Sequence, residues 1–268
     1  MEAHRASGRT GLVVKPCAAI SWSGGKDCCT ALLRTCRDYD VVATITMFAE
    51  DGARSRSHGL RPEVLSAHAQ RLGVRNLTGR CSWRSYTKEY IRLLSEASAM
   101  GITHIIFGDI MGDAHRTWDE GVCAVHGLTA VLPLWGESTR TLAEEFIASG
   151  STAVIVTARA AYLDATWLGR SIDLETIEEL ENRGVDPCGE FGEYHTLVTS
   201  TPLFNSPLDI AFGAREMHSD CWALDVTLAS PVRSAFPGPP PASPKPPGEG
   251  GKPHRGEGGR RTKEHASG

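Results

Sequence analysis

A serine, two glycines, a lysine and an aspartate stand together near the start of the chain, at residues 23–27. The apolar run at residues 17–21 predicts a buried strand before them, and residues 27–37 predict a helix after them. Paired glycines let a turn approach an anion closely, because they lack Cβ. Free N–H groups at a helix start favour negative charge, and Lys26 adds a full positive charge. The segment therefore predicts a phosphate-binding loop.

The spacing around this loop excludes two common nucleotide motifs. A Walker A loop requires Gly-x-x-x-x-Gly-Lys-Ser/Thr, but Ile20 stands at the first glycine position and Asp27 replaces the hydroxyl residue. A Gly-x-Gly-x-x-Gly fingerprint is also absent from this segment. The string Ser-Gly-Gly-Lys-Asp resembles instead the PP-loop of ATP pyrophosphatases, which split ATP between its α and β phosphates. An ordinary strand–turn–helix corner is the alternative interpretation.

A second group of polar residues follows another expected strand. Gly108 and Asp109 come directly after the apolar residues 104–107, and Asp109 could hold magnesium or a ribose hydroxyl. Capping of the next turn is the alternative role for Asp109. Further on, Arg116 and Arg140 could meet phosphate or carboxylate through bidentate contacts. Solvated helix arginines explain them equally well.

The third dense segment is Gly184–Thr196, which is too rich in glycine for a helix. If it is extended, Glu193 and His195 point to the same side. Together with Glu190 they could form a pocket for a cation or an amine, or a metal pair. A pair of ligands is weak evidence for a metal, because structural sites need four ligands and catalytic zinc three. A plain surface loop also remains open.

Strands and helices alternate in the body of the chain. We expect strands at residues 41–48, 104–107 and 153–157, and helices at 63–72 and 86–100. Strands alternating with helices of this length predict βαβ units and a parallel sheet, and thus an α/β fold. Ligands of such sheets bind outside the carboxyl ends of the strands, where the loop at residues 23–27 and Asp109 are expected to lie.

Composition narrows the class of protein further. The chain has 268 residues, 41% of them hydrophobic, and a formal net charge of −4, which argues against a dedicated nucleic-acid or membrane-surface protein. No apolar run is long enough to span a membrane, and residues 1–10 lack the apolar segment of a secretory signal. Eight cysteines without Cys-x-x-Cys spacing favour reduced thiols. We therefore expect a cytoplasmic protein.

The two ends of the chain differ from its body. Residues 231–268 hold nine of the fifteen prolines and few large apolar side chains, which is typical of a disordered tail. This tail carries seven Lys and Arg against three Glu, so it is either a solvated appendage or a weak contact for RNA or an acidic partner. Residues 1–12 are expected to be flexible.

Taken in order along residues 15–230, these motifs resemble the diphthine–ammonia ligase family. The resemblance rests on the PP-loop, on Gly-Asp-Ile followed by Arg116 and Glu120, on Pro-Leu-Trp with Arg140, and on Gly-Glu-x-Gly-Glu-Tyr-His-Thr. It implies a Rossmann-like, HUP-type PP-loop domain over residues 13–160 and a smaller C-terminal substrate-binding domain over 161–230. Family members make the last amide of diphthamide, on a modified histidine of elongation factor 2, from ATP and ammonium.

The resemblance also implies roles for individual residues. Lys26, Glu190 and Glu193 would be catalytic, and Asp109 is the candidate ligand for Mg²⁺. The residues expected to bind ATP are Ser23, Gly24, Gly25, Lys26, Asp27, Cys28, Gly108 and Asp109. Those expected to bind the acyl substrate are Arg116, Glu120, Arg140, Glu190, Glu193, Tyr194, His195 and Thr196. A homo-oligomer is compatible with the sequence.

This chain departs from the family's pattern at three positions. Cys28 stands where the PP-loop usually has serine, and Phe191 and His195 stand where the substrate motif resembling Glu-Gly-Gly-Glu-x-Glu has glycine and glutamate. Acids and aromatic faces are natural partners of the trimethylammonium group of diphthine. The loss of one acid therefore weakens the prediction of diphthine as the substrate more than the prediction of the ligase reaction. An amide ligase for another carboxylate, a tRNA-modifying PP-loop enzyme and a non-catalytic ATP sensor therefore remain open.

Overall fold

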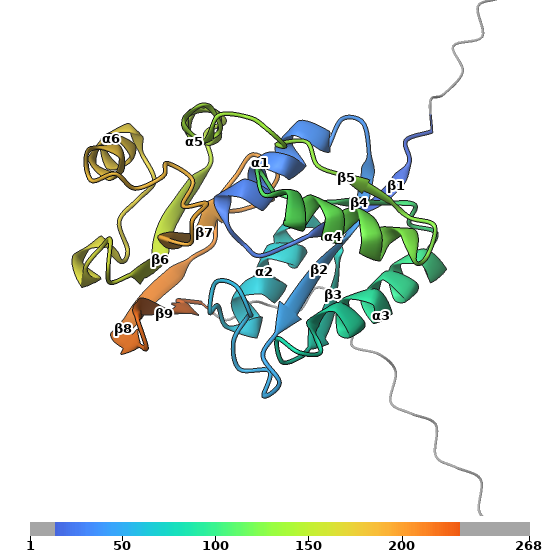
Figure 1. The fold of residues 1–268 in the computed structure, drawn as a ribbon, viewed down its shortest axis with the longest axis horizontal. Helices are drawn as coiled ribbons and strands as arrows, with labels where there is room; N and C mark the ends of the chain where they lie inside the picture. The colour runs from blue at the N-terminus through green and yellow to red at the C-terminus, as the bar shows by residue number, and fades with distance from the viewer. Residues whose placement is uncertain (1–13, 231–268) are drawn as a thin grey trace, which may run out of the picture. The chain divides into compact units, whose positions relative to one another are not determined.

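Within residues 14–230, which the computed structural model describes, five strands form a parallel sheet in the order β3-β2-β1-β4-β5. All neighbouring strands of this sheet run parallel. The strands are β1 (Cys17–Ser21), β2 (Asp40–Phe48), β3 (Arg75–Arg80), β4 (His104–Ile106) and β5 (Thr129–Val131). The predicted α/β fold with a Rossmann-like parallel sheet is confirmed (Figure 1).

Four helices connect these strands and cover both faces of the sheet. They are α1 (Lys26–Thr35), α2 (Pro62–Leu72), α3 (Tyr86–Ala99) and α4 (Asp113–Ala124). Successive side chains of a strand point to opposite faces, and accordingly Ala18 and Ile20 pack in one core cluster with α1 and α2. Ala19 packs in a second cluster with α3 and α4. The carboxyl end of β1 thus lies between two helical layers.

A second sheet of four antiparallel strands has the order β7-β6-β9-β8. Its strands are β6 (Thr152–Arg159), β7 (Tyr194–Ser200), β8 (Ile210–His218) and β9 (Cys221–Leu228), and the helices of this part are α5 (Thr139–Ala148), a 3-10 turn (Ala165–Trp167) and α6 (Leu174–Asn182). In Figure 1 these strands, yellow to orange, lie apart from β1 to β5.

The expectation that the strand near residues 153–157 extends the parallel sheet is wrong. This strand, β6, pairs antiparallel with β7 and β9. A short apolar run suits a buried strand in either kind of sheet, and its partners lie far away in the sequence. We therefore propose that the boundary between the two parts of the chain lies between β5 and β6, rather than after residue 160.

The PP-loop joins the two sheets. The N–H of Val198 in β7 donates to the carbonyl oxygen of Gly24 at 2.9 Å. Beside it, Trp22 Nε1 donates to His68 Nδ1 at 3.2 Å, and His68 Nε2 lies 2.8 Å from the carbonyl oxygen of Val198. Burial lowers the pKa of His68 to about 4, so the ring is neutral near neutral pH and its Nε2–H donates. These hydrogen bonds hold β7 against the start of the phosphate loop.

Some predictions concern the ends of the chain or its environment. The predictions of a flexible N-terminus at residues 1–12 and of a disordered tail at residues 231–268 fall outside the described residues. Among the helices of residues 14–230, none has the length and apolar character needed to cross a membrane. All eight cysteines are free thiols in the structure.

Candidate active site

Two glycines shape the PP-loop. Gly24 has φ of +86°, a left-handed conformation that favours glycine, and a Cβ there would lie 2.7 Å from Leu65 Cδ2. A Cβ on Gly25 would lie 2.4 Å from His58 Cε1. Gly25 is also the N-cap of α1, and no described side chain caps that helix end. The loop therefore turns tightly into a helix start whose dipole favours an anion.

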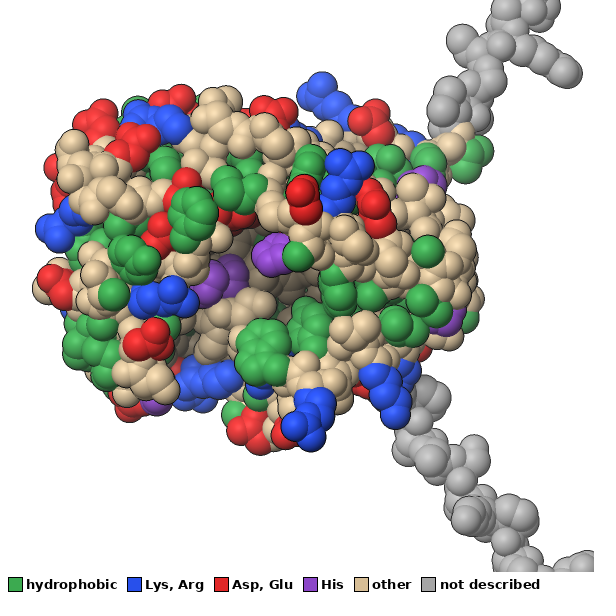
Figure 2. Space-filling view, in the orientation of Figure 1, with side chains coloured by type: hydrophobic (Ala, Val, Ile, Leu, Met, Phe, Trp, Pro, Cys, Tyr) green, Lys and Arg blue, Asp and Glu red, His purple; other side chains and the backbone are tan. Residues whose placement is uncertain are grey.

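A cavity of about 550 Å³ opens at the carboxyl ends of β1 and β4. Three histidines line it, and Figure 2 shows histidine side chains within a hollow on this face. It is the place where ligands of open parallel sheets bind. Of the residues predicted from the sequence, those that line it are Ser23, Lys26, Asp27, Cys28, Gly108, Asp109, Glu190, Tyr194, His195 and Thr196.

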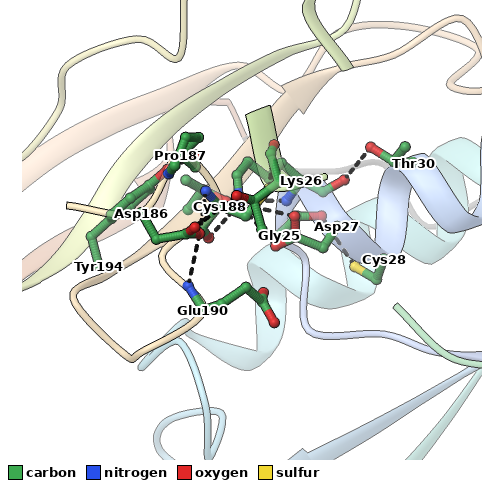
Figure 3. Close-up of polar contacts among 12 residues, drawn as sticks. Gly25, Lys26, Asp27, Cys28, Thr30, Asp186, Pro187, Cys188, Glu190 and Tyr194 are labelled. Atoms are coloured by element: carbon green, nitrogen blue, oxygen red, sulfur yellow. Dashed lines mark hydrogen bonds and ion pairs between the residues drawn. The ribbon is translucent and has the colours of Figure 1, made fainter. Parts of the chain in front are cut away.

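Lys26 links the PP-loop to the Gly184–Thr196 segment (Figure 3). Its side chain is 2% exposed, and Nζ lies 2.9 Å from both carboxylate oxygens of Asp27 and 2.6 Å from the carbonyl oxygen of Cys188. Its backbone N–H donates to Thr196 Oγ1 at 3.1 Å. Burial lowers the pKa of Lys26, but the Asp27 carboxylate raises it, and the net shift is upward. Lys26 is therefore a buried permanent cation at the cavity.

Two carboxylates organise the Gly184–Thr196 loop, the half-buried Asp186 and the buried Glu193. Asp186 Oδ1 accepts hydrogen bonds from the N–H groups of Cys188 at 2.8 Å and Glu190 at 3.3 Å. Glu193 accepts from the N–H groups of Asp186 at 3.3 Å and Phe191 at 2.9 Å. Glu193 is 2% exposed and is absent from the cavity lining. The contacts of Glu193 thus hold the loop, and its catalytic role stays a prediction.

Glu190 is the acid of this loop that faces the cavity. Burial, together with the nearby charge of Asp27, raises its pKa to about 8. Such a carboxyl group exchanges a proton close to neutral pH, which suits a general acid or base. Burial also raises the pKa of Asp109, whose Oδ1 lies 3.2 Å from His115 Nδ1.

Two residues at the cavity escaped the sequence analysis. The ring of His58 stacks on that of His195, with centroids 4.6 Å apart and planes at 17°, and His58 Nδ1 lies 2.8 Å from the carbonyl oxygen of Thr196. Burial lowers the pKa of His58 to about 4 and that of His195 to about 3, so both rings are neutral. The second residue is Asp119 of α4, which is 2% exposed.

Several predicted residues lie off the cavity wall. Arg116 pairs with Glu120 one turn away in α4, at 2.8 Å, and Arg140 pairs with Glu144 at 2.7 Å and with Glu181. Gly24 and Gly25 also lie outside the lining and act through the turn. Gly108 lines the cavity, but a Cβ there would lie 2.7 Å from the backbone nitrogen of Cys28. Its main effect is to let β4 approach the start of α1.

The described residues fit magnesium bound together with ATP, but no protein-only metal centre. Among residues 14–230, no group of three or more His, Cys, Asp or Glu could hold a metal ion. Mg²⁺ bound with a nucleotide takes only one or two carboxylates besides phosphate oxygens and water. Asp109 lines the cavity, whereas Asp27 is engaged by Lys26. Asp119 and Glu190 line the cavity as well, and the role of Asp109 as the magnesium ligand stays a prediction.

Two protein-family models match this chain. Residues 17–130 match the diphthamide synthase N-terminal domain, and residues 138–232 match the diphthamide synthase C-terminal domain. The chain belongs to the diphthamide synthase family. The gap between the two matched ranges begins at the end of β5 and closes just before α5.

Diphthine–ammonia ligases are the curated relatives of this family member. The protein of Rattus norvegicus is 28% identical over 74% of this chain and 84% of its own, and that of Danio rerio is 29% identical over 74% of this chain and 88% of its own. That of Schizosaccharomyces pombe is 28% identical over 68% of this chain but only 34% of its own.

A crystal structure titled as a predicted tRNA methyltransferase subunit of Methanocaldococcus jannaschii has a TM-score of 0.36 at 16% identity, over 70% of this chain and 98% of that one. That score is too low to support a comparison.

The structure shows the environment of two residues that depart from the family's pattern, Cys28 and Phe191. The Cys28 thiol donates to the carbonyl oxygen of Gly25 at 3.1 Å and lies 3.5 Å from Ser23 Oγ. Its hydrogen-bonding capacity is thus taken up by the PP-loop itself. Phe191 is 65% exposed, so the side chain that replaces glycine points largely to solvent.

Proposed function

We propose that this protein is an ATP-dependent amide ligase that activates a substrate carboxylate and transfers ammonia to it, with diphthine on elongation factor 2 as the first candidate substrate. The observation that carries the proposal is the direct contact of the PP-loop with the Gly184–Thr196 loop. Lys26 reaches Cys188 through its side chain and Thr196 through its backbone. A nucleotide on the PP-loop and a substrate held by the second loop would therefore share one cavity.

The first step of the proposed reaction is adenylation. A carboxylate oxygen of the substrate attacks the α-phosphorus of ATP, the bond to the β-phosphate breaks, and an acyl-adenylate and pyrophosphate form. The N–H groups at the start of α1 and the charge of Lys26 would stabilise the departing pyrophosphate. Mg²⁺, with Asp109 as its protein ligand, would neutralise phosphate charge. No protein nucleophile is required, so the protein contributes positioning and charge stabilisation.

Ammonia then attacks the carbonyl carbon of the acyl-adenylate, and the amide forms as AMP leaves. The attacking species must be neutral ammonia, so ammonium has to lose a proton first. Glu190 faces the cavity, and its raised pKa of about 8 allows it to accept that proton once it is ionised. Glu193, whose oxygens already accept two backbone N–H groups, would support Glu190 by holding the loop.

The experiment is product analysis with nitrogen-15 ammonium. The protein is incubated with ATP, Mg²⁺ and elongation factor 2 bearing diphthine, and AMP, ADP and labelled amide are measured. We expect AMP to form only with that substrate, in equal amount to the labelled amide. Lys26→Ala should abolish both products, whereas Lys88→Ala, a lysine on the exposed face of α3, should leave them unchanged.

Two other outcomes of this experiment test the substrate and the adenylation chemistry separately. No AMP in a preparation shown to bind ATP rejects diphthine as the substrate. That result would favour an amide ligase for another carboxylate, the second candidate. The neutral His195 favours this second candidate, because it replaces an acid of the family's motif and removes a charge that would attract trimethylammonium. ADP in place of AMP contradicts the adenylation chemistry itself.

A further inference from the structure

His58 lies against the PP-loop, although the proposed reaction gives it no role. It stands in the loop between β2 and α2 and lines the cavity. A Cβ on Gly25 would lie 2.4 Å from His58 Cε1 and 3.2 Å from its Nδ1, so one edge of the imidazole ring faces the backbone of the PP-loop. Because Cε1 is bonded to both ring nitrogens, Nε2 also lies beside the start of α1. The ring therefore stands where the helix start and Lys26 favour a phosphate group.

Contacts on several sides fix this ring in place. Nδ1 of His58 lies 2.8 Å from the carbonyl oxygen of Thr196, and the ring stacks on that of His195 with centroids 4.6 Å apart. The loop that carries His58 is closed on itself. The N–H of Ser55 donates to the carbonyl oxygen of Leu60 at 2.8 Å, and the N–H of Leu60 donates to Ser55 Oγ at 3.0 Å. The orientation of His58 is thus set by the fold itself.

These contacts also define which ring nitrogen carries the proton. A carbonyl oxygen only accepts, so Nδ1 of His58 donates, and the neutral ring has a lone pair at Nε2. Among residues 14–230, no group donates to that lone pair. Burial lowers the pKa of His58 to about 4, and the charge of Lys26 adds to the lowering. The stacked ring of His195 is neutral as well, with the charges of Lys26, Asp27 and Arg159 acting on it.

A chain of phosphates needs more positive charge than this cavity supplies. Lys26 is the single Lys or Arg in the described lining, and the Asp27 carboxylate holds its ammonium group at 2.9 Å (Figure 3). Three more carboxyl groups line the same cavity, those of Asp109, Asp119 and Glu190. One phosphate charge about 4 Å from an imidazole shifts its protonation equilibrium on the order of a thousandfold. A shift of that size brings protonation of His58 close to neutral pH.

We propose that His58 takes up a proton from solvent when ATP binds, and that its Nε2–H then donates to a phosphate oxygen beside Lys26. Both nitrogens of an imidazolium ring donate, so the contact of Nδ1 with Thr196 is kept. The added charge would also stabilise the departing pyrophosphate, and the proton returns to solvent when pyrophosphate leaves. The inference rests on the proposed function in one respect, namely that the PP-loop binds ATP.

Titration calorimetry of the full chain with ATP, in two buffers of different ionisation enthalpy, counts the protons taken up. ATP exchanges protons itself, so the wild type is compared with His58→Gln, whose amide can still donate to Thr196 but takes no proton. At pH 7 we expect the wild type to take up roughly half a proton more than this variant. A proton taken up on binding favours binding at low pH, so between pH 6 and pH 8 the ATP affinity of the wild type should fall about tenfold more. His218→Gln, an exposed histidine of β8 outside the lining, should match the wild type.

An NMR titration of the His58 Cε1–H signal in the wild type covers the case in which His58→Gln does not fold. Saturating ATP should move the midpoint of this titration up towards neutral pH. An unchanged midpoint overturns the proposal, as does equal proton uptake by the wild type and His58→Gln. Uptake that His195→Gln abolishes and His58→Gln keeps would assign the proton to His195 instead.

This test and the AMP assay fail separately. ATP binding without proton uptake rejects the role of His58 and leaves the proposed ligase reaction standing. Proton uptake without AMP formation leaves the role of His58 standing and rejects the substrate. A chain that binds no ATP contradicts both proposals.

Discussion

Replacing Gly108 by alanine tests whether the close approach of β4 to α1 positions the phosphate site. A Cβ at this position would lie 2.7 Å from the backbone nitrogen of Cys28 and 2.9 Å from its Cα, about 0.7 Å closer than ordinary contact at 3.4 Å. Backbone cannot rotate away as a flexible side chain can, so the start of α1 must move. Overpacking of this kind costs about 1–3 kcal/mol, and a displacement approaching 1 Å lowers a rate on the order of 100-fold.

Gly121 offers the matched control for this substitution. It lies on the exposed side of α4, and a Cβ there meets no heavy atom within 4 Å. Gly121→Ala should stabilise the helix by about 0.5–1 kcal/mol and leave ATP affinity unchanged. Thermal unfolding, ATP titration and AMP formation are measured for both variants. ATP affinity and AMP formation at wild-type level in Gly108→Ala would refute the reasoning, because the phosphate loop would then tolerate the shift.

Three further predictions concern carboxylates. Glu193→Ala leaves two partly buried N–H groups without their acceptor and should lower the free energy of unfolding by about 2–4 kcal/mol, with faster hydrogen exchange at Phe191. Unchanged stability with lost activity would mean that Glu193 contacts the substrate instead. Burial raises the pKa of Glu190 from 4.5 to about 8, so the wild type loses stability as the pH rises between these values. Urea unfolding should therefore show Glu190→Gln to be more stable than the wild type by on the order of 2 kcal/mol at pH 8, but not at pH 4. Hydrogen bonds from Arg61 and Arg54 lower the pKa of Asp225 from 3.8 to about 2. The stability that the ionised Asp225 contributes is present above the unfolded pKa of 3.8 and is lost as the pH falls through the folded pKa of about 2. Asp225→Asn should therefore lower the free energy of unfolding by about 1 kcal/mol at neutral pH and leave it unchanged at pH 2.

The elements of the parallel sheet that carry a strong local pattern could be predicted from the sequence. The strand at residues 17–21 and the helix beginning at Pro62 lie as expected, since an apolar run and a proline mark them locally. The polar strand β3 could not be predicted, because only Gly79 in it is buried and its identity as a strand depends on pairing with β2. Sheet membership of β6 depends in the same way on partners far along the chain.

More of the chemistry of the site than of its geometry could be predicted from the sequence. Residue types at 23–27 indicate a phosphate loop, whereas the division of labour between Glu190 and Glu193 depends on which one faces the cavity. Asp119 also carries a signal in the sequence. It shares the buried side of α4 with Val122 and Cys123, three and four residues on, and a carboxylate in such an apolar stripe indicates a special role.

Transfer of an oxygen atom tests the central claim most directly. The substrate carboxylate is labelled with oxygen-18, the protein is supplied with ATP, Mg²⁺ and ammonium, and the nucleotide product is analysed by mass spectrometry. If the carboxylate attacks the α-phosphorus, one labelled oxygen leaves with AMP, and an unlabelled nitrogen takes its place in the amide. Label in inorganic phosphate beside ADP would contradict the account, because attack would then fall on the γ-phosphorus.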